Sequence, residues 1–261
     1  MSAPTTSDCN QDAARAHGSS LQRLVGRHSW ALLINADCRD VTEQLQADAI
    51  ISDPPYGMKN NCDYTRFTMG PNGHGEASSR KYDAVLHDDE PFDPAPWLDY
   101  PAVVLFGSNH YAQRLPVGTT LIWLKRQDHA FGTFLSDGEV AWMKGGHGVY
   151  AKRDQTLMAE TNSRLHPTQK PVPLMAWCMD MAKVPVGATV LDPYAGSGTT
   201  AIACIRTGRK FIGIEKDPKH YQTACERIDR EMAQGVLLPA NASNSATGDR
   251  GASPAKADSK A

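Results

Sequence analysis

The fold is decided by the stretch Val190-Leu191-Asp192-Pro193-Tyr194-Ala195-Gly196-Ser197-Gly198-Thr199-Thr200-Ala201. An apolar run over residues 188–191 predicts a buried strand, which passes through a glycine turn into a helix over residues 199–207. The spacing of Gly196, Gly198 and Ala201 matches G-x-G-x-x-G/A, which is typical of nucleotide-binding turns in this strand-turn-helix setting. Glycines let a ligand approach the backbone closely, and the helix start offers free N–H groups. The stretch therefore predicts an open α/β sheet with a nucleotide site at this strand's end.

An acidic residue completes that site. Glu215 lies 19 residues after Gly196, at the end of the next predicted strand (210–214), where a carboxylate can hold ribose hydroxyls. The plain alternative for the glycines is a helix cap or a tight turn. A P-loop would need Lys after Gly198, and Thr199 stands there, so phosphate hydrolysis is disfavoured. The residues expected to bind the nucleotide are Asp192, Tyr194, Ala195, Gly196, Ser197, Gly198, Thr199, Glu215 and Lys216.

A second motif ends another predicted strand, over residues 47–51. It reads Ser52-Asp53-Pro54-Pro55-Tyr56-Gly57, and neither proline can donate a hydrogen bond to a sheet, so the strand must stop there. The loop presents a carboxylate, a carbonyl and an aromatic ring at a strand's carboxyl end, where ligands bind in open α/β sheets. Taken alone, the motif is equally compatible with an ordinary strand end.

Together the two motifs resemble those of the amino-methyltransferases of DNA, which use S-adenosylmethionine. Their order, with the Asp-Pro-Pro-Tyr loop before the glycine turn, is similar to that of the circularly permuted β group. A third motif, His166-Pro167-Thr168-Gln169-Lys170-Pro171, resembles the segment that precedes the cofactor strand in that group. The resemblance covers roughly residues 29–230, although the family usually carries Phe where Tyr194 stands. It implies a Rossmann-like methyltransferase fold, with a doubly wound, seven-stranded, mostly parallel α/β sheet.

The resemblance also implies roles for individual residues. His166, Thr168 and Lys170 are expected at the methionine end of the cofactor, and Asp37 at its adenosine. An alternative for Asp37 is the N-cap of a helix that starts near Arg39. The catalytic residues implied are Asp53, Pro54, Pro55 and Tyr56, of which Asp53 also borders the cofactor.

The chemistry suits such a loop. Asp53 and the Pro54 carbonyl can accept the two N–H bonds of an exocyclic amine, which aims its lone pair at the sulfonium methyl and offsets developing positive charge. Tyr56 is expected to stack on a base flipped out of the duplex. The predicted reaction is direct in-line transfer to adenine N6 in a specific DNA sequence, as in restriction-modification enzymes. Cytosine N4 is the alternative amine, because Asp at position 53 favours adenine only by family habit. A cofactor- and DNA-binding module without turnover is the alternative of another class.

The distribution of charge along the chain indicates where DNA would bind. The 261-residue chain has a net charge of −2 and a pI near 6.5, so any positive charge for DNA must be local. Residues 114–170 hold eight Lys/Arg against five Asp/Glu, and about 145–165 is expected to be a short target-recognition segment with a flexible glycine loop at 145–148. A charged surface on an ordinary enzyme is the alternative. The residues expected to contact DNA are Lys125, Arg126, His129, Lys152, Arg153 and Arg164.

Composition sets the remaining expectations. Residues 1–20 are predicted to be a disordered leader, 21–233 the methyltransferase domain and 234–261 a disordered tail. Six cysteines without C-x-x-C or metal-ligand spacing predict reduced thiols, no metal and a cytoplasmic location. No apolar stretch is long enough for a membrane span, and a homodimer is left open. Further strands are predicted over 30–34, 102–107, 120–124 and 139–143, and helices over 41–45, 109–114, 173–182 and 218–232.

Overall fold

The computed structural model describes residues 22–25, 30–41, 45–58, 90–132, 136–155 and 169–234. Their helices and strands run in the order β1 (Gln22–Val25), β2 (Ala31–Asn35), α1 (Cys38–Val41), β3 (Ala49–Ser52), η4 (Ala95–Trp97), β4 (Ala102–Phe106), η5 (Ser108–His110), η6 (Ala112–Arg114), β5 (Gly118–Leu124), η7 (Asp128–Ala130), β6 (Gly138–Arg153), α3 (Val172–Met181), β7 (Thr189–Asp192), α4 (Thr199–Arg206), β8 (Lys210–Glu215) and α5 (Pro218–Ala233), where η marks a 3-10 turn.

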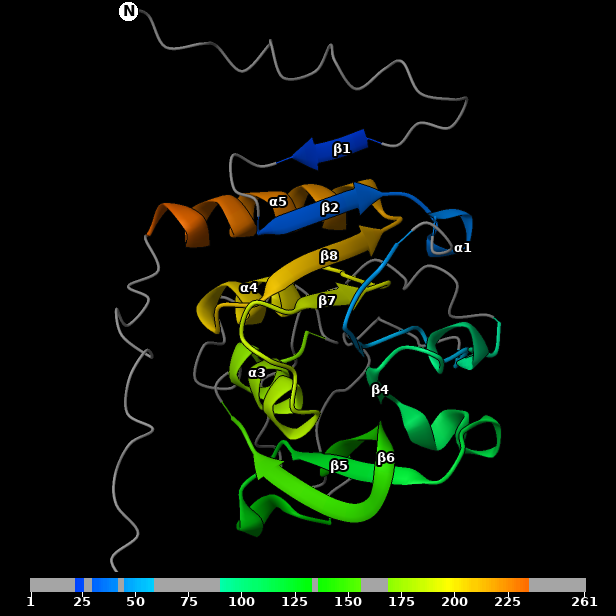
Figure 1. Cartoon of the computed structure of the whole chain (residues 1–261). Helices are drawn as coiled ribbons and strands as arrows, with labels where there is room; N and C mark the ends of the chain where they lie inside the picture. The colour runs from blue at the N-terminus through cyan, green and yellow to red at the C-terminus, as the bar shows by residue number, and fades with distance from the viewer. Residues whose placement is uncertain are drawn as a thin grey trace, which may run out of the picture.

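One sheet organises these elements, in the order β1-β2-β8-β7-β3-β4-β6-β5 (Figure 1). The central neighbours β2, β8, β7, β3 and β4 are all parallel, whereas β1 pairs antiparallel with β2 and β6 with β4. The mostly parallel α/β sheet predicted from the sequence is thus confirmed. All seven expected strands are present as β2–β8, and β1 adds an eighth, antiparallel strand at one edge.

The strand order reverses between β3 and β7, which are paired in the centre of the sheet. From β7 the chain moves outward to β8, and from β3 it moves the opposite way to β4. Strands that diverge in this way leave a crevice outside their carboxyl ends, and open α/β sheets bind their ligands there. Strands β3, β4, β5 and β6 precede β7 and β8 in the chain, which is the permuted order that the resemblance implies.

Both faces of the sheet are covered, as a doubly wound fold requires. Alternate residues of a strand point to opposite faces, so Ile51 packs with α3, α4 and α5, while Ile50 packs with α1 and the segment around Phe92 and Trp97. Ile50 and Ile51 are fully buried. β3 is therefore fixed from both sides, and the loop that follows it starts from a rigid base.

The structure corrects the prediction for the glycine segment 145–148. A flexible loop was expected, but β6 continues through it to Arg153. The strand turns back at Gly145 and Gly146, whose φ angles of 80° and 68° suit glycine. It then pairs with β5 a second time, because Thr120 lies opposite both Trp142 and Val149. The glycines therefore bend the strand without ending it.

Two short helices also differ from expectation. The helix expected over 109–114 is replaced by η5 and η6, since the backbone N–H of Tyr111 bonds the Ser108 carbonyl three residues back and no side chain caps the turn. The helix expected over 41–45 begins earlier, as α1.

Several predicted features lie outside the described residues. They include the leader 1–20, the tail from 235 onward, and the part of the target-recognition segment after residue 155. Within the described part of the chain, no helix has the length and apolar character that crossing a membrane requires.

Candidate active site

A cleft of about 950 Å³ lies at the carboxyl ends of the central strands. The loops after β2, β3, β4, β7 and β8 all contribute to its walls. The Asp53–Tyr56 loop and the glycine turn at Gly196 both line it, although their strands are about 140 residues apart in the chain. The two predicted motifs thus open into the same space.

The side chain of Asp192 links the strand before the Asp53 loop to the helix after the glycine turn. Its Oδ1 accepts a hydrogen bond from Ser52 Oγ of β3 at 2.6 Å, and its Oδ2 accepts one from Thr200 Oγ1 of α4 at 2.6 Å. The backbone N–H of Tyr194 adds a third bond at 3.1 Å. Burial raises the pKa of Asp192 to about 6. Asp192 was predicted to contact the cofactor. In the structure its carboxylate oxygens accept hydrogen bonds that join β3, β7 and α4.

The glycine turn is held in one shape by its neighbours. Gly196 and Gly198 have φ angles of 53° and 82°, in the left-handed region that favours glycine. A Cβ atom at Gly198 would come within 3.1 Å of the Ala224 Cβ on α5. Also from α5, Arg227 Nη1 donates to the Ser197 carbonyl at 2.6 Å and to Ser197 Oγ at 3.0 Å. Helix α5 thus supports the turn from outside the cleft.

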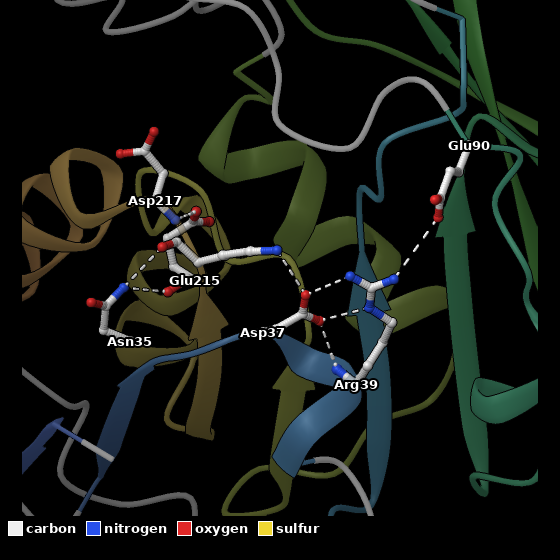
Figure 2. A network of polar contacts seen from close by, with 7 residues as sticks. Asn35, Asp37, Arg39, Glu90, Glu215 and Asp217 are labelled. Carbon is white, nitrogen blue, oxygen red and sulfur yellow. Dashed lines mark hydrogen bonds and ion pairs between the residues drawn. The ribbon is translucent and has the colours of Figure 1, made fainter. Parts of the chain in front are cut away.

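Glu215 is bound to this turn by backbone donors. Its Oε2 accepts from the N–H of Gly196 at 2.7 Å. Its Oε1 accepts from the N–H of Asp217 at 2.7 Å (Figure 2). Burial raises the pKa of this carboxyl above its usual value. An ionised carboxylate offers about four acceptor positions. Glu215 therefore keeps acceptor capacity toward the cleft, where ribose hydroxyls were predicted.

Asp37 is the centre of an ion cluster (Figure 2). Its Oδ1 accepts from the backbone N–H and the Nε of Arg39, both at 3.0 Å, while its Oδ2 accepts from Arg39 Nη2 at 2.7 Å and from Lys216 Nζ at 2.9 Å. The Arg39 guanidinium holds the pKa of Asp37 well below its usual range. Arg39 also reaches Glu90 at 3.9 Å. The capping contact considered for Asp37 is present, and Asp37 and Lys216 both line the cleft.

On the other side of the cleft, Asp53 is held by side chains. The hydroxyl of Tyr56 donates to its Oδ1, and Lys170 Nζ donates to its Oδ2. The Tyr56 ring stacks on His110, with centroids 5.1 Å apart and planes 11° apart. Gly107, with φ at 70°, leaves room for that ring, because a Cβ atom there would lie 2.0 Å from it. The loop is therefore shaped by the end of β4 as well as by its prolines.

Sequence reasoning missed Glu139, the second residue of β6. Its Oε2 lies 2.9 Å from Lys170 Nζ, and Lys125 pairs with its Oε1. Within the described residues Oε2 has no partner of hydrogen-bond geometry, so its contact with Lys170 is an ion pair alone. Burial raises the pKa of Glu139, but the two lysines outweigh it and hold that pKa at about 2. The only signal in the sequence was an acid at the start of an apolar strand.

The residues predicted to contact DNA divide into two groups. Lys125 lines the cleft and pairs with Glu139. Arg126 and Arg153 instead contact η7, through the Ala130 carbonyl at 3.3 Å and through Asp128 respectively. His129 belongs to η7 and is exposed, and Lys152 precedes Arg153 at the end of β6. Arg164 lies outside the described residues, as do His166 and Thr168.

The cleft lies at the carboxyl ends of the central strands, where open α/β sheets bind their ligands, and it joins the glycine turn to the polar Asp53 loop. Residues 122–226 match the family model for N6/N4 DNA methylases, described as "DNA methylase". The resemblance to DNA methylases that the motifs predict is thereby confirmed. The matched segment contains β6, α3, the glycine turn and Glu215.

Individual relatives match over shorter stretches. YubD of Escherichia coli (strain K12), a predicted methylase, is 38% identical over 79 residues, which are 29% of this chain and 34% of that protein. Type II methyltransferase M2.DpnII of Streptococcus pneumoniae is 41% identical over 66 residues, 25% of this chain and 24% of that protein. The matches thus span about a third and about a quarter of these relatives. The crystal structure of the M1.HpyAVI-SAM complex is similar over 76% of this chain and 99% of that chain, at 23% identity and a TM-score of 0.48.

Proposed function

We propose that this protein is a site-specific DNA methyltransferase, which transfers the methyl group of S-adenosylmethionine to the exocyclic N6 of adenine. The observation that carries the proposal is the shared cleft. The Asp53–Tyr56 loop and the turn of Gly196 with Glu215 open into it from neighbouring strands, which the Ser52–Asp192 bond holds together.

The nucleotide side of the cleft fits S-adenosylmethionine. The turn at Gly196 places no side chain between its backbone and a ligand, and Glu215 offers acceptors for ribose hydroxyls. Phe92 and Trp97 meet Tyr194 edge to face, at 5.9 and 6.2 Å between centroids, and all three line the cleft. They form an apolar wall suited to an adenine ring. When bound, the cofactor supplies an electrophilic methyl group on its sulfonium.

The other side of the cleft fits an amine. Each oxygen of Asp53 already accepts one bond, from Tyr56 or Lys170, and a carboxylate has further acceptor positions. Asp53 and the Pro54 carbonyl would accept the two amine N–H bonds, turning the lone pair toward the methyl group and offsetting the positive charge that develops on nitrogen. Proximity and orientation then provide the catalysis, and no covalent intermediate with the protein is required.

The amine lies inside a duplex before reaction, so the base must be flipped out at a cost of a few kcal/mol. Tyr56 is proposed to contact the flipped base, beside His110, with which it already stacks. Arg126, Lys152 and Arg153, at the ends of β5 and β6, are proposed to contact DNA phosphates. Lys125 is better placed to act within the cleft through Glu139.

Methyl transfer from tritiated S-adenosylmethionine to plasmid DNA tests the proposal, with Asp53→Ala as the matched control. The expected result is incorporation by the natural protein and none above background by the variant. Binding of both cofactor and DNA without any transfer would instead support the binding module without turnover.

The choice of adenine needs its own measurement. Adenine and cytosine both carry an amine with two N–H groups, and the matching family model covers both kinds of enzyme. The proposal of adenine rests on Asp at position 53, by resemblance. Digesting the methylated DNA to nucleosides and identifying them by mass decides between the two. N4-methylcytosine as the main product would replace adenine by cytosine and leave the mechanism unchanged.

A further inference from the structure

Four charged side chains alternate in sign along the amine side of the cleft: Asp53, Lys170, Glu139 and Lys125. They come from four places in the chain, after β3, before α3, in β6 and after β5. The Lys170 side chain is only 4% exposed, and its Nζ lies 5.2 Å from the centre of the Phe106 ring. Lys170 is thus enclosed between two carboxylates and an aromatic face.

A buried lysine is costly unless its charge is compensated. Lys170 lies beside Asp53, which must be a charged acceptor in the proposed reaction. A protonated Asp53 would turn one of its oxygens into a donor. Burial raises the pKa of Asp53, and Lys170 opposes that rise, whereas Glu139 adds to it. The charge state of Asp53 therefore depends on two residues of opposite sign.

We propose that Lys170 is a positioning residue of the methyl-transfer site, which holds the Asp53 carboxylate charged and turned into the cleft, and that Glu139 in turn holds Lys170. The inference rests on the proposed methyltransferase function and gives Lys170 a role distinct from the cofactor contact that the resemblance implies. Lys125 completes the arrangement by pairing with the outer oxygen of Glu139.

Other groups also face Asp53, and the test must separate their effects. They are Tyr56 in the same loop, His110 stacked on Tyr56, Tyr111 after β4, Asp192 at the end of β7, Glu139 in β6 and Lys170 before α3. Of these, Lys170 and Glu139 act in opposite directions. Their removal must therefore shift the titration of Asp53 in opposite directions, which damage to the fold would not do.

The experiment measures kcat against pH at saturating cofactor and DNA for the natural protein, Lys170→Met, Lys170→Arg and Glu139→Gln. Lys210→Met, at the exposed start of β8, is the control. Because the rate rises with pH as Asp53 ionises, Lys170→Met should move the acid limb up by about 1–3 pH units. Lys170→Arg should bring it back, Glu139→Gln should move it down, and the control should leave it in place.

A second readout does not depend on turnover. Carboxyl carbon shifts of protein labelled with ¹³C-aspartate, with the Asp53 signal identified through Asp53→Asn, should show the same opposite displacements. If Lys170→Met does not fold, the downward shift of the acid limb in Glu139→Gln, with no shift in Lys170→Arg, still tests the inference. Acid limbs and carboxyl titrations that stay in place would overturn the inference while leaving methyl transfer intact. Absence of transfer by the natural protein would instead reject the proposed function, and the carboxyl titration would still test the pairing.

Discussion

Two carboxylates that line the cleft, Glu215 and Asp53, are held in different ways. Glu215 accepts its bonds from two backbone N–H groups, 19 and two residues away in the chain. Asp53 accepts its bonds from two side chains, one three residues away and the other 117 residues away. Backbone donors neither titrate nor rotate, whereas a lysine and a tyrosine do both. The nucleotide side is therefore fixed by the turn itself, and the amine side depends on residues brought in by the fold.

The difference suits the two tasks. A ligand that is bound unchanged needs a carboxylate of constant position, and local backbone geometry supplies it. An acceptor for developing positive charge must be ionised in a buried site, and a nearby cation supplies that condition. Four measurements test this difference between the two carboxylates.

The largest effect is expected for Asp53→Ala. Losing the acceptor for the amine should reduce the methyl-transfer rate by at least about 100-fold, by analogy with other groups that stabilise developing charge. Calorimetric titration should show nearly unchanged cofactor affinity, because Glu215 and the glycine turn are intact. Asp53→Asn, of the same shape but uncharged, is the matched control and should also be slow. A substantial rate in either variant would contradict the role given to Asp53.

Glu215→Ala should act on the opposite side of the cleft. Each charge-assisted bond to a ribose hydroxyl is worth about 1.5–3 kcal/mol, so the dissociation constant of S-adenosylmethionine should rise at least about tenfold. Glu215→Gln keeps an acceptor but loses the charge, so its dissociation constant should lie between those of the natural protein and Glu215→Ala. At saturating cofactor the rate should recover. An unchanged dissociation constant would mean that Glu215 only supports the turn.

The DNA surface should respond independently of both carboxylates. Replacing Arg126, Lys152 and Arg153 together removes up to three phosphate contacts, and each contributes about 0.9 to the slope of binding against the logarithm of salt concentration. The slope should therefore flatten by up to about 2.7, with cofactor affinity unchanged. Replacing Lys144, Lys183 and Lys210 removes the same charge elsewhere and is the control. An unaltered slope would place the DNA surface outside the ends of β5 and β6.

An effect on stability, and not on catalysis or binding, is expected at Asp192, where the two sides of the cleft are joined. The pKa of Asp192 is raised by burial from 3.8 to about 6, so the folded state holds a proton that the unfolded state has lost. Its contribution to stability is therefore present below pH 4 and lost as pH rises toward 6, by up to about 3 kcal/mol. Asp192→Asn should flatten that part of the pH dependence in urea unfolding. Identical pH dependence in both proteins would show that Asp192 does not titrate there.

Much of the fold was readable from local patterns. Seven apolar runs became β2–β8, each bounded by turn residues. The central parallel strands were the easiest to read, because a parallel strand buried on both faces has a nearly continuous apolar sequence. Glu215 could be linked to Gly196 because both belong to one strand-turn-helix-strand unit. What could not be read was contact over long distances. Glu139 meets Lys170 only after β6 has paired with β4, and no local period records that pairing.

The bend in β6 was missed for a related reason. Glycines at 145–148 are typical of loops. In the structure the residues after them, from Val149 onward, pair with β5 and continue the strand. Tertiary pairing thus overrode a local preference.

The space left by Gly107 has a consequence for the evolution of the site. A methyl group there would meet the Tyr56 ring at 2.0 Å, so a side chain at position 107 requires a smaller residue at position 56. Related sequences should show the two positions varying together: a bulky aromatic residue in the loop after β3 with glycine at the end of β4, and side chains at the second position only where the first is small. A variant made at Gly107 alone would be expected to disturb Asp53 through the ring, from a strand that contributes no charge to the chemistry.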